Sequence, residues 1–259
     1  MAVPFSAEFV VLLGLIVVVS GAVNGLAGFG FAVVGTMALA TVVDPATAVV
    51  LMIIPMVAAN AMLVGELSAA EFRTCGQRFG PLVGSALVGT IVGMAVLDAL
   101  PGGPLRIGLG LITLGFVASQ QRALPLPSIG AGGSTLDGRP AMIVVGSLSG
   151  VLFGATNVGV QLVAYLRSRD LSHSLFVGVV ALVFLGINAI RVGAAGVLGL
   201  YPTLTVFGLS VVASIPAVGG VVIGSRLRQR VSSRLRRRVV LGLLTVIGIR
   251  LLLGGLGIA

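Results

Sequence analysis

Two stretches of the sequence place polar side chains among glycines inside long apolar runs. The first, Gly21–Gly30, contains four glycines and the amide Asn24. The second, Gly146–Gly159, also contains four glycines, together with Thr156 and Asn157. Each glycine costs about 1 kcal/mol in a helix interior relative to alanine, so we expect a helix to break at each stretch. Paired breaks at matching places in a membrane chain predict the two sides of one binding site.

The chemistry expected of such a site is the binding of a small anion. Exposed backbone N–H groups at the start of a helix carry partial positive charge and favour an anion, and side-chain amides and hydroxyls add further donors. Polar groups within apolar spans are informative because they cost free energy in hydrocarbon unless they have partners. The candidate substrate-binding residues are Asn24, Gly25, Gly28, Gly30, Asn60, Gly154, Thr156, Asn157, Gln161, Asn188 and Arg191.

Several of these residues have a structural alternative. Asn60 and Asn188 could instead hydrogen-bond between neighbouring helices. Arg191 could pair with the substrate or form an outer gate, or it could extend to the outer membrane interface. Asp44, directly before Pro45, fits a helix N-cap better than a proton carrier. Glycines spaced four apart form helix-packing faces by default, and these are Gly146, Gly150 and Gly154, Gly89 and Gly93, and Gly220 and Gly224.

The composition indicates an integral membrane protein. Of the 259 residues, 57% are hydrophobic and only 9% are charged, whereas soluble domains have about 25% charged residues. The net charge of +9 could indicate nucleic-acid binding. However, seven of the sixteen basic residues fall within residues 226–238, between two apolar runs, as in a cytoplasmic loop. We therefore expect no nucleic-acid partner.

The reactive side chains do not form a recognisable catalytic set. The seven acidic residues lie at the ends of apolar runs or in polar segments. A single cysteine, Cys75, excludes an intrachain disulfide, and a single histidine, His173, argues against a transition-metal site built from this chain alone. We predict no enzymatic activity, no cofactor and no metal site.

The apolar runs predict an all-α fold with about eight spans, because a bilayer-crossing helix needs roughly 20 apolar residues. The first region, residues 9–43, fits a full helix followed by a shorter or re-entrant piece, and a polar loop is expected at 65–78. The other spans are expected at 45–64, 79–97, 105–119, 141–166, 174–198, 205–223 and 239–256. The expected division is an N-terminal repeat at 1–119, a central linker at 120–139 and a C-terminal repeat at 140–259.

Matching motifs indicate that the two halves are repeats. Asn60–Gly65 matches Asn188–Gly193 at an offset of 128 residues. Pro81–Gly89 matches Pro216–Gly224 at an offset of 135, and a Leu-Gly-Leu motif at Leu109 recurs 132 residues later. Four crossings per half would make the repeats parallel, and an extra crossing at each break would make them inverted. The sequence leaves both alternatives open.

The arginines predict the orientation. With eight crossings, the loops near Arg106, near Arg167 and Arg169, and at residues 226–238 fall on one side. Under the positive-inside rule that side is cytoplasmic, which places both termini outside.

Taken in order, these motifs resemble the TauE/SafE family of sulfite and organosulfonate exporters. The resemblance rests on Gly21–Gly30, Asp44–Ala48, Asn60–Gly65 and Pro81–Gly89, with their second-half counterparts. It implies a secondary transporter of the prokaryotic plasma membrane that exports sulfite, thiosulfate or an organosulfonate by alternating access. The expected partners are a small anion and the lipid bilayer, and homo-oligomerisation is left open. The alternatives are a carrier for a different small solute or ion, and a non-transporting membrane scaffold subunit.

Overall fold

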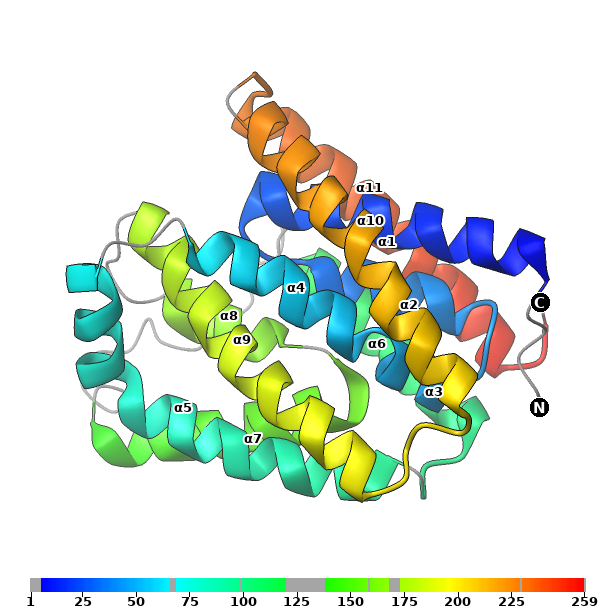
Figure 1. Ribbon diagram of the computed structural model, residues 1–259, viewed down its shortest axis with the longest axis horizontal. Helices are drawn as coiled ribbons and strands as arrows, with labels where there is room; N and C mark the ends of the chain where they lie inside the picture. Colours follow the sequence, from blue (N-terminus) through cyan, green and yellow to red (C-terminus); the bar gives the residue numbers. More distant parts are fainter. Residues whose placement is uncertain are drawn as a thin grey trace.

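The computed structural model describes residues 6–65, 69–97, 99–119, 138–157, 159–167, 173–228 and 230–258, and every regular element in them is a helix (Figure 1). The two termini lie close together at the right of the view, and the turn between the last two helices lies at its top (Figure 1). The helices are α1 (Ala7–Ala27), α2 (Phe31–Ala40), α3 (Pro45–Leu51), α4 (Ile53–Val64), α5 (Ala69–Leu97), α6 (Gly102–Ser119), α7 (Arg139–Thr156), α8 (Val160–Arg167), α9 (His173–Val197), α10 (Leu204–Arg228) and α11 (Ser233–Gly255).

The expected break is present in both glycine-rich stretches. Between α1 and α2, Gly28 has φ 78° and Gly30 has φ 109°, left-handed values that glycine adopts without steric cost. Between α7 and α8, Asn157 has φ 61° and is the sole non-glycine residue with positive φ in the described part of the chain. Asparagine is the residue other than glycine that most readily caps a helix in this conformation.

Among the residues that the structure describes, six helical segments are long and apolar enough to cross a membrane: Ala7–Ala27, Pro45–Val64, Gln77–Leu97, Arg139–Thr156, Gly178–Val197 and Leu204–Arg228. The spans expected at 105–119 and 239–256 form α6 and α11, which fall outside this set, and the apolar part of α11, Leu241–Gly255, is shorter. The structure therefore supports a multi-pass helical membrane protein, and the count of eight spans stays a prediction.

Polar segments around the spans are more helical than the sequence indicates. The prediction of a polar loop at 65–78 is wrong for most of that range, because α5 begins at Ala69. The basic segment at 226–238 also contains helix ends, since α10 extends to Arg228 and α11 begins at Ser233. The N-cap expected at Asp44 is confirmed, because its carboxylate accepts hydrogen bonds from the backbone N–H groups of Ala46 and Thr47 at 3.0 and 3.4 Å.

Glycine faces hold two pairs of helices in close parallel contact. On α1 and α10, Gly21 and Gly25 lie against Ala217 and Val221, and Gly220 and Gly224 lie against Val18 and Ala22. A Cβ atom at any of these four glycines would run into a backbone carbonyl oxygen of the facing helix. The same holds between α5 and α7 for Gly89, Gly93, Gly146, Gly150 and Gly154. The spaced glycines are therefore packing faces that let two backbones approach closely.

Helices α6 and α11 pack in opposite directions, which corrects the placement of one arginine. Gly110 approaches Leu252, and Gly255 approaches Ile107, so the start of α6 lies beside the end of α11. Arg106 donates to the Val43 carbonyl at 3.2 Å near this end, whereas Arg234 lies in the first turn of α11, at its other end. The expectation that Arg106 shares one side with residues 226–238 is therefore wrong.

Candidate functional site

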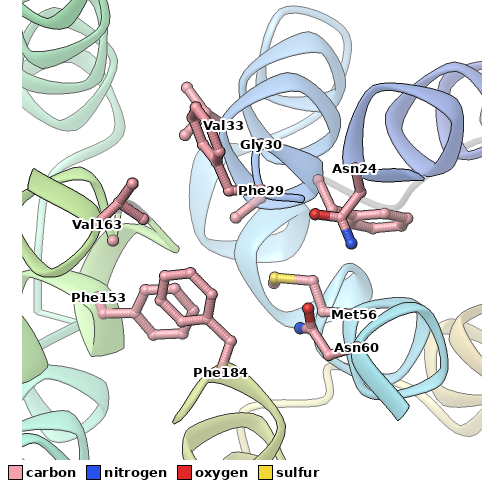
Figure 2. A pocket seen from close by; sticks show the side chains of 12 residues that line it. Asn24, Phe29, Gly30, Val33, Met56, Asn60, Phe153, Val163 and Phe184 are labelled. Atoms are coloured by element: carbon pink, nitrogen blue, oxygen red, sulfur yellow. The ribbon is translucent and has the colours of Figure 1, made fainter. Parts of the chain in front are cut away.

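A cavity lies between the two helix breaks (Figure 2). Its cavity volume is about 20 Å³, room for about one water molecule, and the figure is about 350 Å³ when the open space at its mouth is included. The first half contributes α1, α2, α4 and the first break, and the second half contributes α7, α8, α9 and the second break. The lining residues are Asn24, Phe29, Gly30, Phe31, Ala32, Val33, Met56, Asn60, Phe153, Gly159, Val163 and Phe184.

The polar side of the cavity is formed by two amides. Asn24 lies in the last turn of α1 and Asn60 in α4, and their side chains are 2% and 4% exposed. Figure 2 shows both on the same side of the cavity, across from Phe153 and Phe184. The Asn24 Nδ2 atom is buried and has no hydrogen-bond partner among the described residues. Because an unpaired buried donor costs about 1–3 kcal/mol, this N–H group is available to a ligand oxygen in the cavity.

The opposite wall is aromatic and has a buried cation behind it. The rings of Phe153 and Phe184 stack with centroids 5.1 Å apart and an interplanar angle of 15°. The Arg191 guanidinium carbon lies 5.0 Å from the Phe153 centroid, in cation–π contact. Phe184 and Arg191 are two turns apart on α9, roughly 10.5 Å along the axis. This spacing lets the Phe153 ring insert between them.

Arg191 is fully buried and is bound to neutral oxygen atoms. Its Nη1 atom donates to Asn188 Oδ1 at 3.0 Å, and its Nη2 atom donates to the Gly154 carbonyl at 3.3 Å. Asn188 in turn donates to the Phe184 carbonyl at 2.8 Å. The Gly154 carbonyl belongs to the last turn of α7, where helix carbonyls lack intrahelical partners. Arg191 therefore stabilises the end of α7 at the break and keeps one positive charge close to the cavity.

Asn157 lies at the second break but does not line the cavity. Its Nδ2 atom donates to Thr36 Oγ1 at 2.8 Å and to the Val49 carbonyl at 2.9 Å. These bonds connect the break of the second half to α2 and α3 of the first. Through these hydrogen bonds Asn157 stabilises the packing behind the cavity wall.

We expect Asn157→Leu to lower the melting temperature in detergent. Leucine removes two buried hydrogen bonds, each worth about 0.5–1.5 kcal/mol, and it disfavours the left-handed backbone by about 1–2 kcal/mol. Asn157→Gly removes the same hydrogen bonds but tolerates the backbone, so it should melt between the wild type and the leucine variant. A leucine variant that melts with the wild type would contradict this role.

The other residues that were predicted to bind substrate lie in several different places. Gly30 lines the cavity. Gly28 ends α1, and Gly25 and Gly154 pack against α10 and α5. The Thr156 hydroxyl donates to the Leu152 carbonyl of its own helix at 2.5 Å. Gln161 lies in α8, and its side chain is outside the described part of the structure.

Sequence reasoning missed the apolar residues that form most of the cavity. Phe153, Met56 and Phe184 are typical of any apolar helix, and nothing in their type distinguishes a cavity wall from a core. A weak indication existed on α9, where Phe184, Asn188 and Arg191 recur at a spacing that places them on one helix face. Because of this spacing, one face of α9 carries both Phe184 of the aromatic wall and the buried Arg191.

Comparison with known proteins identifies the family. A model of the sulfite exporter TauE/SafE family matches residues 13–251, nearly the whole chain. No curated protein and no solved structure gives a significant match. The family is one of transporters and not a class of enzymes, which agrees with the apolar helices and the broken spans. The chain belongs to the sulfite exporter TauE/SafE family.

Proposed function

We propose that the protein is a secondary transporter that exports a small sulfur-containing anion, such as sulfite, thiosulfate or an organosulfonate. The observation that carries this proposal is the unpaired Nδ2 donor of Asn24, buried in a cavity that both helix breaks line. The family match supports the substrate class. The cavity also favours a transporter over a membrane scaffold, because a scaffold needs no such space between the breaks.

In this proposal the anion lies between the two halves. Asn24 donates to a substrate oxygen, Asn60 supplies a second amide, and Gly30 lets backbone approach the ligand closely. Arg191 contributes positive charge from behind Phe153. Asn188, Gly154, Thr156, Asn157, Gly25 and Gly28 hold the breaks and the arginine in place, and Gln161 is a further candidate on α8.

We infer that the two halves are inverted repeats. In residues 1–119 and 140–259, α1 is equivalent to α7, and α5 is equivalent to α10. The contact of α1 with α10 therefore has an equivalent in the contact of α7 with α5. In the same way α6 is equivalent to α11, and these two helices run antiparallel. Equivalent helices of opposite direction are what an axis in the membrane plane produces.

The glycine contacts suggest which parts move during alternating access. They bind α1 tightly to α10, and α5 tightly to α7, so each rigid unit contains helices from both halves. The cavity lies between α1 and α4 on one side and α7 and α9 on the other. We propose that these two units rock against each other, in place of one sequence half rocking against the other.

We propose that the turn between α10 and α11 faces the cytoplasm of a prokaryotic cell. Arg226 and Arg228 end α10, and Arg234 lies in the first turn of α11, which fits the positive-inside rule. The C-terminus follows the other end of α11, and the N-terminus lies near it (Figure 1), so both termini are outside in this orientation.

A thermal-shift experiment in detergent tests the function. A ligand that binds only the folded protein at 100 times its Kd stabilises it by about 2.7 kcal/mol. We expect sulfite or an organosulfonate to raise the melting temperature of the wild type more than chloride does at equal ionic strength. Asn24→Leu should lose most of this shift, because a hydrogen bond to a charged group contributes about 1.5–3 kcal/mol.

The matched control is Thr245→Val. Thr245 lies on α11 outside the cavity, and its hydroxyl donates to the Leu241 carbonyl of its own helix at 2.8 Å. This variant also loses a polar group from a span, yet it should keep the ligand-induced shift. Equal shifts in Asn24→Leu and the wild type would remove Asn24 from the site, and no shift with any sulfur anion would contradict the proposed function.

A further inference from the structure

We propose that the cavity accepts its substrate as a singly charged anion, so that sulfite is carried in its protonated form, as bisulfite. This inference rests on the proposed function and narrows the substrate class. It favours bisulfite and organosulfonate monoanions over the dianions of sulfite, thiosulfate and sulfate.

The first reason is charge balance. Arg191 is the single charged side chain in the buried class among the residues whose burial is described, and it lies one aromatic ring away from the cavity. One positive charge balances one negative charge, whereas a dianion would leave an excess negative charge in a low-dielectric interior. The desolvation cost of an ion rises with the square of its charge, so the second charge is much more expensive than the first.

The second reason is the small number of donors. Among the described residues, only Asn24 and Asn60 bring polar side chains to the lining, and the other ten described lining residues are apolar or glycine. Arg191 is not among the lining residues and lies against the Phe153 ring, so it contributes electrostatic potential and not direct ligand hydrogen bonds. A dianion in water has many strong hydrogen bonds, and two side-chain amides with the backbone N–H groups at the start of α2 replace few of them.

The third reason is the chemistry of the amides. A side-chain amide has both a donor N–H₂ and an acceptor oxygen. It can therefore donate to a bare oxygen of the substrate and accept from a protonated one. The apolar lining, including Val33 and Met56, is also compatible with the small hydrocarbon part of an organosulfonate.

The consequence is that the substrate carries its own proton. Bisulfite crosses intact, with no bond formed or broken in the site, and it releases its proton on the far side according to the pH there. Each turnover moves one negative charge and one acid proton. Transport then needs no titrating carboxylate in the cavity, and the described lining contains none.

The titratable groups near the cavity keep their charge states around neutral pH. Arg191 on α9 remains positive, as arginines do at these pH values. Its neighbour Tyr201 precedes α10, and burial raises the pKa of its hydroxyl, with Arg191 lowering it to a smaller extent. Tyr201 is therefore neutral there. His173, at the start of α9, is the side-chain type that titrates near neutral pH, and the methanesulfonate control below separates any effect of it from an effect on the substrate.

The test is flux of radiolabelled sulfite into proteoliposomes that contain the purified full-length protein. Total sulfite is held constant while the pH rises through the second ionisation of the substrate, which lies near neutrality. We expect the flux to fall roughly tenfold for each pH unit above that pKa, in parallel with the bisulfite concentration. Methanesulfonate, a monoanion at every pH used, is the control, and its flux should stay constant.

Two outcomes would overturn the charge selection while leaving the proposed function in place. One is a sulfite flux that stays constant or rises with pH while the methanesulfonate flux is constant. The other is inhibition of bisulfite flux by sulfate or thiosulfate as strongly as by methanesulfonate. A protein that moves none of these sulfur anions at any pH would contradict the proposed function itself.

Discussion

Arg191→Leu is expected to abolish anion binding, whereas Arg250→Leu leaves it unchanged. The two arginines both lie within apolar helices, but Arg191 is fully buried beside the cavity and Arg250 is exposed on α11. Leucine removes the positive charge that balances the ligand and also the hydrogen bonds to Asn188 and Gly154. Loss of a buried charge partner costs about 2–5 kcal/mol, which corresponds to a rise in Kd of roughly 30-fold or more.

Calorimetry checks this prediction by measuring sulfite binding to the purified variants Arg191→Leu, Arg191→Lys and Arg250→Leu. Lysine keeps the charge but cannot reproduce the planar fork or the stacking on Phe153, so a partial loss of affinity is expected. Melting curves without ligand show whether each variant is folded. Wild-type affinity in a folded Arg191→Leu protein would exclude the arginine from substrate recognition.

Gly220→Ala is expected to destabilise the protein strongly, whereas Gly219→Ala is expected to be neutral or stabilising. A Cβ atom at Gly220 would run into the Val18 carbonyl oxygen of α1, and one at Gly219 meets no atom within 4 Å. Both changes raise helix propensity by about 1 kcal/mol. The difference between the free energies of unfolding of the two variants therefore measures the effect of the close contact. Overpacking of this kind costs typically 1–3 kcal/mol, and backbone atoms of a packed helix cannot move aside as a flexible side chain can.

Thermal unfolding of the two variants in the same detergent measures this difference, and flux in proteoliposomes adds a functional readout. The two positions are adjacent on α10, so expression, lipid content and helix composition are closely matched. If α1 and α10 move as one unit, any Gly220→Ala protein that folds should also transport poorly, because the pair is forced apart. Equal melting temperatures for the two variants would show that the contact is looser than the structure indicates.

The sequence alone determined the features that depend on composition and local backbone geometry. Membrane insertion follows from the shortage of charged residues, because hydrocarbon penalises each of them. The break at Gly28 and Gly30 was predictable because positive φ needs glycine, and the N-cap at Asp44 followed from the adjacent Pro45. The packing role of Gly220 and similar glycines was also among the alternatives that spacing indicated.

Only the tertiary structure decided which polar groups face the cavity. Asn24 and Asn157 occur at equivalent kinds of break, yet the first lines the cavity and the second binds Thr36 and Val49, more than 100 residues away in sequence. Asn157 is itself the cap that ends α7, whereas Asn24 lies one turn before the cap Gly28, and Phe153, one turn before Asn157, does line the cavity. Which turn of each helix faces the cavity depends on how the helices pack, and residue type does not specify that packing. The insertion of the Phe153 ring beside Arg191 likewise depends on the contact of α7 with α9. Local propensity acts within a few residues, whereas the site is formed by long-range packing between the two halves of the chain.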